Sequence, residues 1–143
     1  MNRQEALRQL PLRLATGAFM LNSGFGKVDA DKSAAEQLHG FATGAYPVLG
    51  KAEPELFAKA LSAAEIATGL ALLVPFVPAA VAGIGLTAFS AGLIGLYLKT
   101  PGMRKQGSLR PTEQGIALAK DVWLLGIGLS LTFDGLAGKG GRR

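Results

Sequence analysis

Glu65 is the residue whose setting could carry chemistry. It lies near the start of SAAEIATGLALLVPFVPAAV (residues 62–81), and no charged residue follows it from Ile66 to Leu98. In a bilayer such a run is expected and the carboxylate is the exception, because a charge near the centre costs from about 3 to more than 10 kcal/mol. A helix starting near Leu56 would place Glu65 about 14 Å deep. We therefore expect Glu65 to be protonated, paired or facing a water-filled cavity.

Depth along the predicted helices selects the partners of Glu65. Lys120 lies about 6 Å in from the same side, and its long stem can cover much of the gap. Asn22 can hydrogen-bond to either form of the acid. We predict an intramembrane polar cluster of Glu65, Lys120 and Asn22, with Arg13 as the alternative cation. Asp121 points about 100° away from Lys120 and would pair with Arg13 or reach the interface.

Two interpretations of this cluster stay open. A buried polar clasp would fix the register of the helices, whereas a functional site would respond to protons or hold the polar end of a quinone or lipid. The chain has no cysteine, which excludes disulfides, thiol catalysis and cysteine-ligated iron–sulfur or zinc centres. His39 is the only histidine, and we place it in an interfacial loop as a non-ligand. We expect no catalytic residue, no metal site and no cofactor built into the chain; quinone or lipid is the candidate ligand.

The elements that must position these residues are apolar helices. The 143 residues are 49% hydrophobic and 17% charged, against about 25% charged in soluble proteins. Apolar blocks near the length of a membrane span, roughly 20 residues, alternate with charged stretches. Lipid admits only helices or closed barrels, and these blocks are too long for barrel strands. The sequence therefore predicts an all-α integral membrane four-helix bundle in a single domain (1–143), with spans at 8–26, 55–76, 79–98 and 116–136 and a flexible basic tail at 137–143.

Between the first two spans the sequence is mixed in character. A capping-box pattern, Ser33 with Glu36, predicts a short amphipathic helix at the membrane interface over 33–43, and Lys27 is also expected at the interface. The first apolar stretch lacks a small-residue cleavage site, so we interpret it as a retained span. An even number of spans puts both termini on one side of the membrane, and we expect the cytoplasmic side.

The net charge of +5 does not predict nucleic-acid binding. The basic residues flank apolar blocks instead of alternating with aromatic residues, which is typical of membrane flanks. The expected partner is therefore the lipid bilayer, and no nucleic acid. The third span carries small residues that allow close helix packing within the bundle, in a homo-oligomer or with a partner subunit. These are Gly85, Ala88, Ala91, Gly92 and Gly95.

Three stretches together resemble a known family. RLATGAFMLNSGFGKV (13–28), AEIATGLALLVPF (64–76) and AKDVWLLGIGLSL (119–131) look like the DoxX-like family of small four-helix bacterial membrane proteins. The resemblance places the family's polar positions at Arg13, Lys27 and Glu65. It implies a redox-associated protein of the bacterial inner membrane: a non-catalytic subunit or scaffold for a quinone-linked or oxidative-stress enzyme. That partner enzyme would be a membrane protein or a peripheral one.

A small-solute or proton-coupled carrier is the alternative function. A carrier would need a continuous polar path, and the second and third spans offer little beyond Thr68, Thr87 and Ser90. The chain departs from the resemblance in its long polar insert, 29–53, and in its glycine–arginine tail. We expect the insert to serve as a docking surface if a partner enzyme binds.

Overall fold

The computed structural model describes residues 3–140, and over this range the chain is built from helices. They are α1 (Arg3–Val28), α2 (Lys32–Ala45), the 3-10 helix η1 (Pro47–Lys51), α3 (Pro54–Leu73), α4 (Ala79–Lys99), α5 (Ile116–Ala119) and α6 (Val122–Gly140). Extended pairing within these residues is limited to one isolated bridge, Arg104 with Pro111. The predicted all-α class is confirmed.

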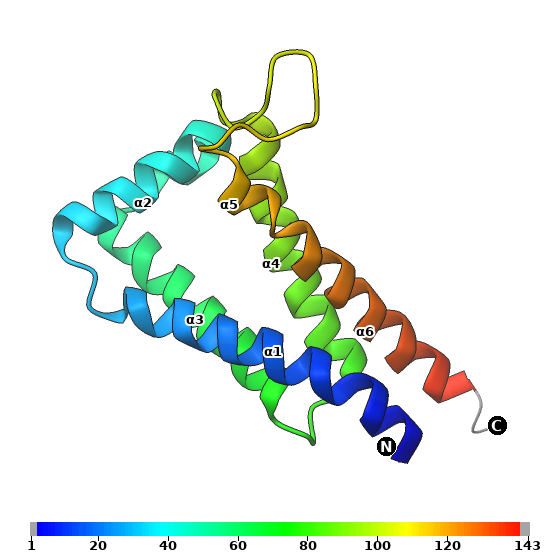
Figure 1. The fold of residues 1–143 in the computed structure, drawn as a ribbon. Helices are drawn as coiled ribbons and strands as arrows, with labels where there is room; N and C mark the ends of the chain where they lie inside the picture. The colour runs from blue at the N-terminus through cyan, green and yellow to red at the C-terminus, as the bar shows by residue number, and fades with distance from the viewer. Residues whose placement is uncertain (1–2, 141–143) are drawn as a thin grey trace.

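Two antiparallel helix pairs form the body of the molecule (Figure 1). In each pair the helices cross at glycines. A Cβ atom added to Gly17 of α1 would lie 3.2 Å from the carbonyl oxygen of Gly69 of α3, and one added to Gly83 of α4 would lie 2.7 Å from that of Gly128 of α6. The backbones therefore touch where side chains would hold them apart, as in closely packed membrane helices.

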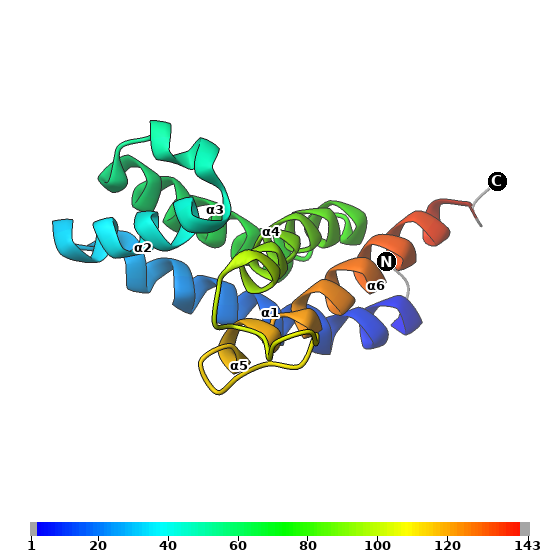
Figure 2. The same cartoon turned by 90° about the horizontal axis from the view of Figure 1, so that it is seen from above.

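Helix α2 connects the two pairs at one end of the molecule (Figure 2). Tyr46, directly after α2, donates its hydroxyl to the carbonyl oxygen of Gly92 in α4 at 2.8 Å, and Lys99 lies 4.7 Å from the centre of the Tyr46 ring. His39 lies within α2, so its predicted loop placement is wrong. Its Nε2 is 2.8 Å from the carbonyl oxygen of Leu49, a contact that ties α2 to η1.

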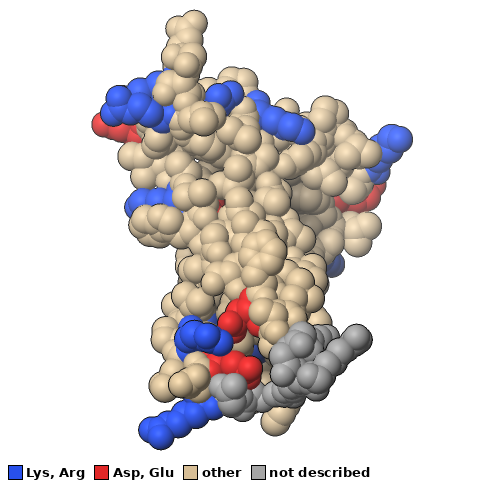
Figure 3. All heavy atoms as spheres, turned by 90° about the vertical axis from the view of Figure 1, so that its right-hand side faces the viewer, with Lys and Arg blue, Asp and Glu red and all other residues tan. Residues whose placement is uncertain are grey.

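Three helical segments are long and apolar enough to cross a membrane: Pro54–Leu73, Ala79–Lys99 and Ile116–Gly138. Helix α1 has the length, but its arginines and other polar residues keep it out of this apolar class, so its crossing stays a prediction. Large apolar side chains cover the outside of the apolar segments, for example Trp123, which is 68% exposed. Figure 3 shows charged side chains gathered towards the two ends of one face, with few between them. This surface suits a bilayer.

Several predicted boundaries move. Helix α3 ends at Leu73, not at 76, because Pro75 cannot continue a helix and restricts the residue before it. The last span, predicted as 116–136, is broken at residues 120–121 between α5 and α6. Helix α6 runs to Gly140, so the tail predicted at 137–143 is helical as far as 140, and 141–143 lie outside the described residues.

The helix between the first two long helices also differs from its prediction. It covers residues 32–45 instead of 33–43, and Asp31 caps it, with Oδ1 accepting from the backbone N–H of Ala34 at 2.8 Å. An aspartate preceding the helix takes the place given to Ser33, because its carboxylate reaches the same unpaired N–H groups.

The small-residue face predicted on the third span is not where α4 meets α6. Ala88 and Ala91 are exposed, and a Cβ atom at Gly92 would meet nothing within 4 Å. The contact with α6 is made instead around Gly83, one helical turn from Thr87. Helical spacing found a small-residue stripe but could not say which neighbour each side of α4 would face.

Candidate functional site

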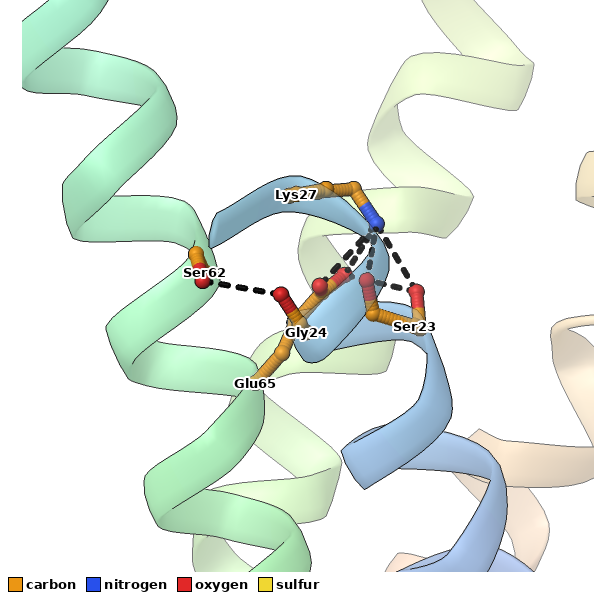
Figure 4. Close-up of polar contacts among 5 residues, drawn as sticks. All are labelled: Ser23, Gly24, Lys27, Ser62 and Glu65. Carbon is orange, nitrogen blue, oxygen red and sulfur yellow. Dashed lines mark hydrogen bonds and ion pairs between the residues drawn. The ribbon is translucent and has the colours of Figure 1, made fainter. Parts of the chain in front are cut away.

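Glu65 is buried at the interface of α1 and α3, where it forms an ion pair with Lys27. The Lys27 Nζ lies 3.0 Å from Oε2 and 3.2 Å from Oε1 of Glu65. The Glu65 side chain is 5% exposed and that of Lys27 is 23% exposed. Figure 4 shows the two side chains reaching towards each other from neighbouring helices. A buried carboxylate therefore has a cation at direct hydrogen-bonding distance.

Two serines complete the hydrogen bonding around the pair. Ser23 Oγ donates to Glu65 Oε1 at 3.2 Å and accepts from Lys27 Nζ at 2.8 Å. Lys27 also donates to the backbone carbonyl oxygen of Ser23 at 3.1 Å. One turn away, Ser62 Oγ donates to the carbonyl oxygen of Gly24 at 2.8 Å, which fastens the two helix backbones (Figure 4). The polar atoms thus satisfy one another inside an apolar interface.

The local sequence explains why these side chains meet. Gly24 has no side chain, and a Cβ atom there would lie 2.7 Å from Cγ1 of Ile66, so only glycine lets α1 approach α3 so closely. Ser23 and Lys27 are four residues apart and share one face of α1. Lys27 lies in the last turn of α1, where the helix dipole favours a cation.

The cluster predicted from sequence is only partly assembled. Glu65 is buried as expected, but its cation is Lys27, so the predicted pairing with Lys120 is wrong. Lys120 is exposed at the break between α5 and α6, and Asn22 is exposed on α1. Asp121, at the same break, is half-buried. Lys27 is predicted to lie at the membrane interface, and the predicted depths do not identify it as the partner of Glu65.

The error has a structural cause. The predicted depths assume that all spans begin at one plane of the membrane. In the structure the last turn of α1 reaches only the middle of α3, and the first half of α3 continues alongside α2 (Figure 1). Lys27 therefore lies level with Glu65. The signal for this site in the sequence is the family resemblance, which places polar positions at Lys27 and Glu65 but does not pair them.

Arg13 is buried, but it does not pair with Glu65 or Asp121. Its Nε donates to the carbonyl oxygen of Leu72 at 2.7 Å, and one terminal nitrogen donates to that of Val74 at 2.8 Å. Further bonds reach the carbonyls of Ala71 and Val77. The last carbonyls of a helix have no partner within the helix. Arg13 thus caps α3 and holds the turn into α4.

The arrangement can hold helices in register; within residues 3–138 no group of three or more histidines and acids is placed to bind a metal ion. Both oxygens of Glu65 and the ammonium of Lys27 are engaged by the chain's own atoms. A proton or ligand would have to compete with these contacts. As it stands the site is a polar clasp between α1 and α3.

Three apolar helical segments of membrane-spanning length, one of them joined to α1 by a buried ion pair, are the features of an integral membrane protein. The DoxX family model matches residues 9–97, well over half of the chain, and the chain belongs to the DoxX family. The matched range contains Arg13, Lys27 and Glu65 but not the stretch 119–131 that was also compared with the family. Comparisons with curated proteins and with solved structures found no match.

Proposed function

We propose that this DoxX-family protein is a non-catalytic membrane subunit or scaffold for a redox enzyme linked to quinone or to oxidative stress. In this role the chain supplies a helical platform in the bacterial inner membrane, and the chemistry belongs to its partner. The bundle would hold the partner, and a quinone or lipid, beside the α1–α3 pair.

The observation that supports a scaffold is the saturation of the buried ion pair. The polar atoms of the Glu65 and Lys27 side chains form hydrogen bonds with each other and with Ser23. Groups held in this way fix the geometry of two helices and offer little reactivity to a substrate. In this proposal the buried pair fixes the register of α1 against α3. Its role is not stability alone, because apolar residues of similar volume would stabilise the interface as well.

The packing between α1 and α3 argues against the carrier alternative. Arg13 and Lys27 lie at opposite ends of this interface, and a polar path between them would have to pass Met20. Met20 is fully buried, and a Cβ atom added to Gly17 would lie only 2.7 Å from Cγ of Leu73. Tight apolar contact fills the route that a solute or proton would use.

The polar insert 29–53 supplies the docking surface in this proposal. It forms α2 and η1, which extend beyond the end of α1 and connect the two helix pairs (Figure 1). Val48 within it is 68% exposed, and Lys32, Glu36 and Lys51 are exposed around it. A mixed surface of this type suits a polar partner at the membrane interface.

The test is co-purification of the tagged protein from its native membrane in a gentle detergent, followed by mass spectrometry and lipid extraction. We expect an oxidoreductase in stoichiometric amount, together with quinone. Glu65→Gln should reduce recovery of the partner, because Lys27 then loses its counter-ion and the clasp loosens. Glu55→Gln, at an exposed position of the same helix, is the matched control and should leave recovery unchanged.

The proposal fails if the protein purifies with bulk phospholipid alone under conditions in which it is folded. It also fails if Glu65→Gln is fully stable and leaves complex formation and the redox phenotype unchanged. Uptake of a solute or protons by reconstituted vesicles, lost in Glu65→Gln, would instead support the carrier.

A further inference from the structure

A second polar site lies at the opposite end of the molecule from α2. A cavity of about 290 Å³ is enclosed by the first turns of α1, the turn between α3 and α4, and the last turns of α6. Its polar lining includes Glu5, Gln9, Arg13 and Asp134. Its volume is close to the lower end of small-molecule sites, roughly 300 Å³.

The hydrogen bonding of the Gln9 side chain indicates that the cavity binds a ligand. The residue is 6% exposed, and its side-chain Nε2 donates to Asp134 Oδ2 at 2.5 Å. Its Oε1 is buried and has no hydrogen-bond partner among residues 3–138. A buried polar atom without a partner costs about 1–3 kcal/mol, and it is rare in folded proteins. The Oε1 atom is an acceptor, so the missing partner is a hydrogen-bond donor.

The other side chains that line the cavity also favour a ligand that donates hydrogen bonds. Asp134 contributes a carboxylate that Arg8 holds from the rim, with Nη2 3.1 Å from Oδ1. Glu5 contributes a second carboxylate, whose Oε1 lies 3.4 Å from the position of a Cβ atom on Gly138. Arg13 turns its guanidinium to backbone carbonyls. The groups that face the cavity are thus mainly acceptors, two of them acidic.

One side of the cavity adjoins an apolar surface. A second, shallow hollow of about 40 Å³ adjoins it, sharing Gln9 and Arg13 and otherwise lined by apolar residues. Leu10 of α1 lines this hollow and is 51% exposed, and Phe76 of the cavity's own lining is 88% exposed. Acidic and basic side chains lie next to one another at this end (Figure 3). The mouth therefore joins a polar pocket to a lipid-facing surface.

We propose that this cavity binds the primary ammonium headgroup of a phospholipid, with its acyl chains along the apolar flank of α1. An ammonium group brings three N–H donors and a positive charge, which match Gln9 Oε1 and the carboxylate of Asp134. The phosphate of the same lipid would lie outward, towards Arg8. This lipid site is separate from the Lys27–Glu65 clasp and does not depend on a redox partner.

The headgroup chemistry can be tested on the full, delipidated wild-type protein in detergent. Binding of lysophosphatidylethanolamine is measured by thermophoresis and compared with its mono-, di- and trimethylated forms. Methylation removes the N–H donors one at a time and keeps the charge. We expect affinity to fall at each step, by at least about tenfold in all, the loss expected for a hydrogen bond to a charged group. Equal binding of the unmethylated and trimethylated lipids would overturn the proposal.

Three further comparisons test the charge of the headgroup, the source of the amine and the residue that binds it. Lysophosphatidylglycerol should bind at least about tenfold more weakly, because its hydroxyls carry no positive charge; binding as tight as that of the amine lipid overturns the assignment. Free phosphoethanolamine should not compete at equal concentration, and competition would make the ligand a soluble amine instead of a lipid.

Gln9→Met should lose about tenfold in affinity for the amine lipid, whereas Gln37→Met, at an exposed site on α2, should retain wild-type binding.

Discussion

Lys27 and Glu65 are 38 positions apart in sequence, yet a contact of 3.0 Å joins the last turn of α1 to the middle of α3. Arg13 makes the corresponding connection at the other end, where it binds the carbonyl oxygen of Leu72 at 2.7 Å. The α1–α3 pair is therefore fastened at both ends by polar contacts and packed by apolar residues between them. Substitutions of Glu65 and of Arg13 test these two contacts separately.

Replacing Glu65 with glutamine should destabilise the protein. The change leaves the Lys27 ammonium in an apolar interface without its counter-ion, and breaking a buried pair costs about 3–5 kcal/mol. Because Lys27 is 23% exposed and water can reach it, we expect a cost below this range, about 2–3 kcal/mol. The measurement is the free energy of unfolding in mixed micelles.

The double variant Lys27→Met with Glu65→Gln separates the ion pair from general damage. Removing both charges leaves no unpaired ion, so the double variant should be more stable than Glu65→Gln alone. Equal destabilisation of Glu65→Gln and the exposed Glu55→Gln would contradict a clasp.

Arg13→Met should cost about 3 kcal/mol or more, because several carbonyls at the end of α3 lose their donor at once. Arg13→Lys should recover only part of this, since an ammonium cannot reproduce the planar fork of five donors. The exposed Arg8→Met is the control, and its surface ion pair should contribute no more than about 1 kcal/mol. Thermal unfolding in detergent ranks the three variants; equal melting temperatures would rule out the cap.

Gly128→Ala should separate α4 from α6. Its Cβ atom would lie 2.8 Å from the backbone nitrogen of Thr87 and 3.1 Å from the carbonyl oxygen of Gly83, and a rigid backbone cannot move aside cheaply. Overpacking of this kind costs about 1–3 kcal/mol. Gly126→Ala, two residues away with nothing within 4 Å, should be neutral or stabilise α6 by up to about 1 kcal/mol. Equal effects of the two alanines on unfolding would refute close contact at Gly128.

The absence of cysteine makes the topology directly measurable. Single cysteines at the exposed positions Gln4, Phe76, Gln37 and Gln106 can be labelled in intact cells with an impermeant maleimide. If α1 crosses the membrane with the termini in the cytoplasm, Gln37→Cys and Gln106→Cys should react from outside, and Gln4→Cys and Phe76→Cys only after lysis. Labelling of Gln4→Cys together with Gln106→Cys from outside would instead indicate three spans.

Apolar block length and the placement of prolines were enough to predict the long helices. The runs that became α3 and α4 were bounded to within a few residues because Pro75 cannot continue α3 and Pro78 directly precedes the first residue of α4. The break between α5 and α6 at Lys120 had no comparable signal. The sequence also predicts the wrong capping residue for α2, because Asp31 and Ser33 both carry side-chain oxygens that can accept from the first N–H groups of the helix.

Composition and periodicity determined that this chain is helical and membrane-like and that Glu65 must be protonated, paired or in contact with water, because an isolated charge in an apolar run is costly. Only the tertiary structure decided that the partner is Lys27, that Arg13 caps α3, and that Gln9 is buried beside a cavity. These outcomes depend on how far one helix slides along another. That offset is set where Gly24 and Gly17 allow α1 to touch α3, a relation between distant residues that no local pattern encodes.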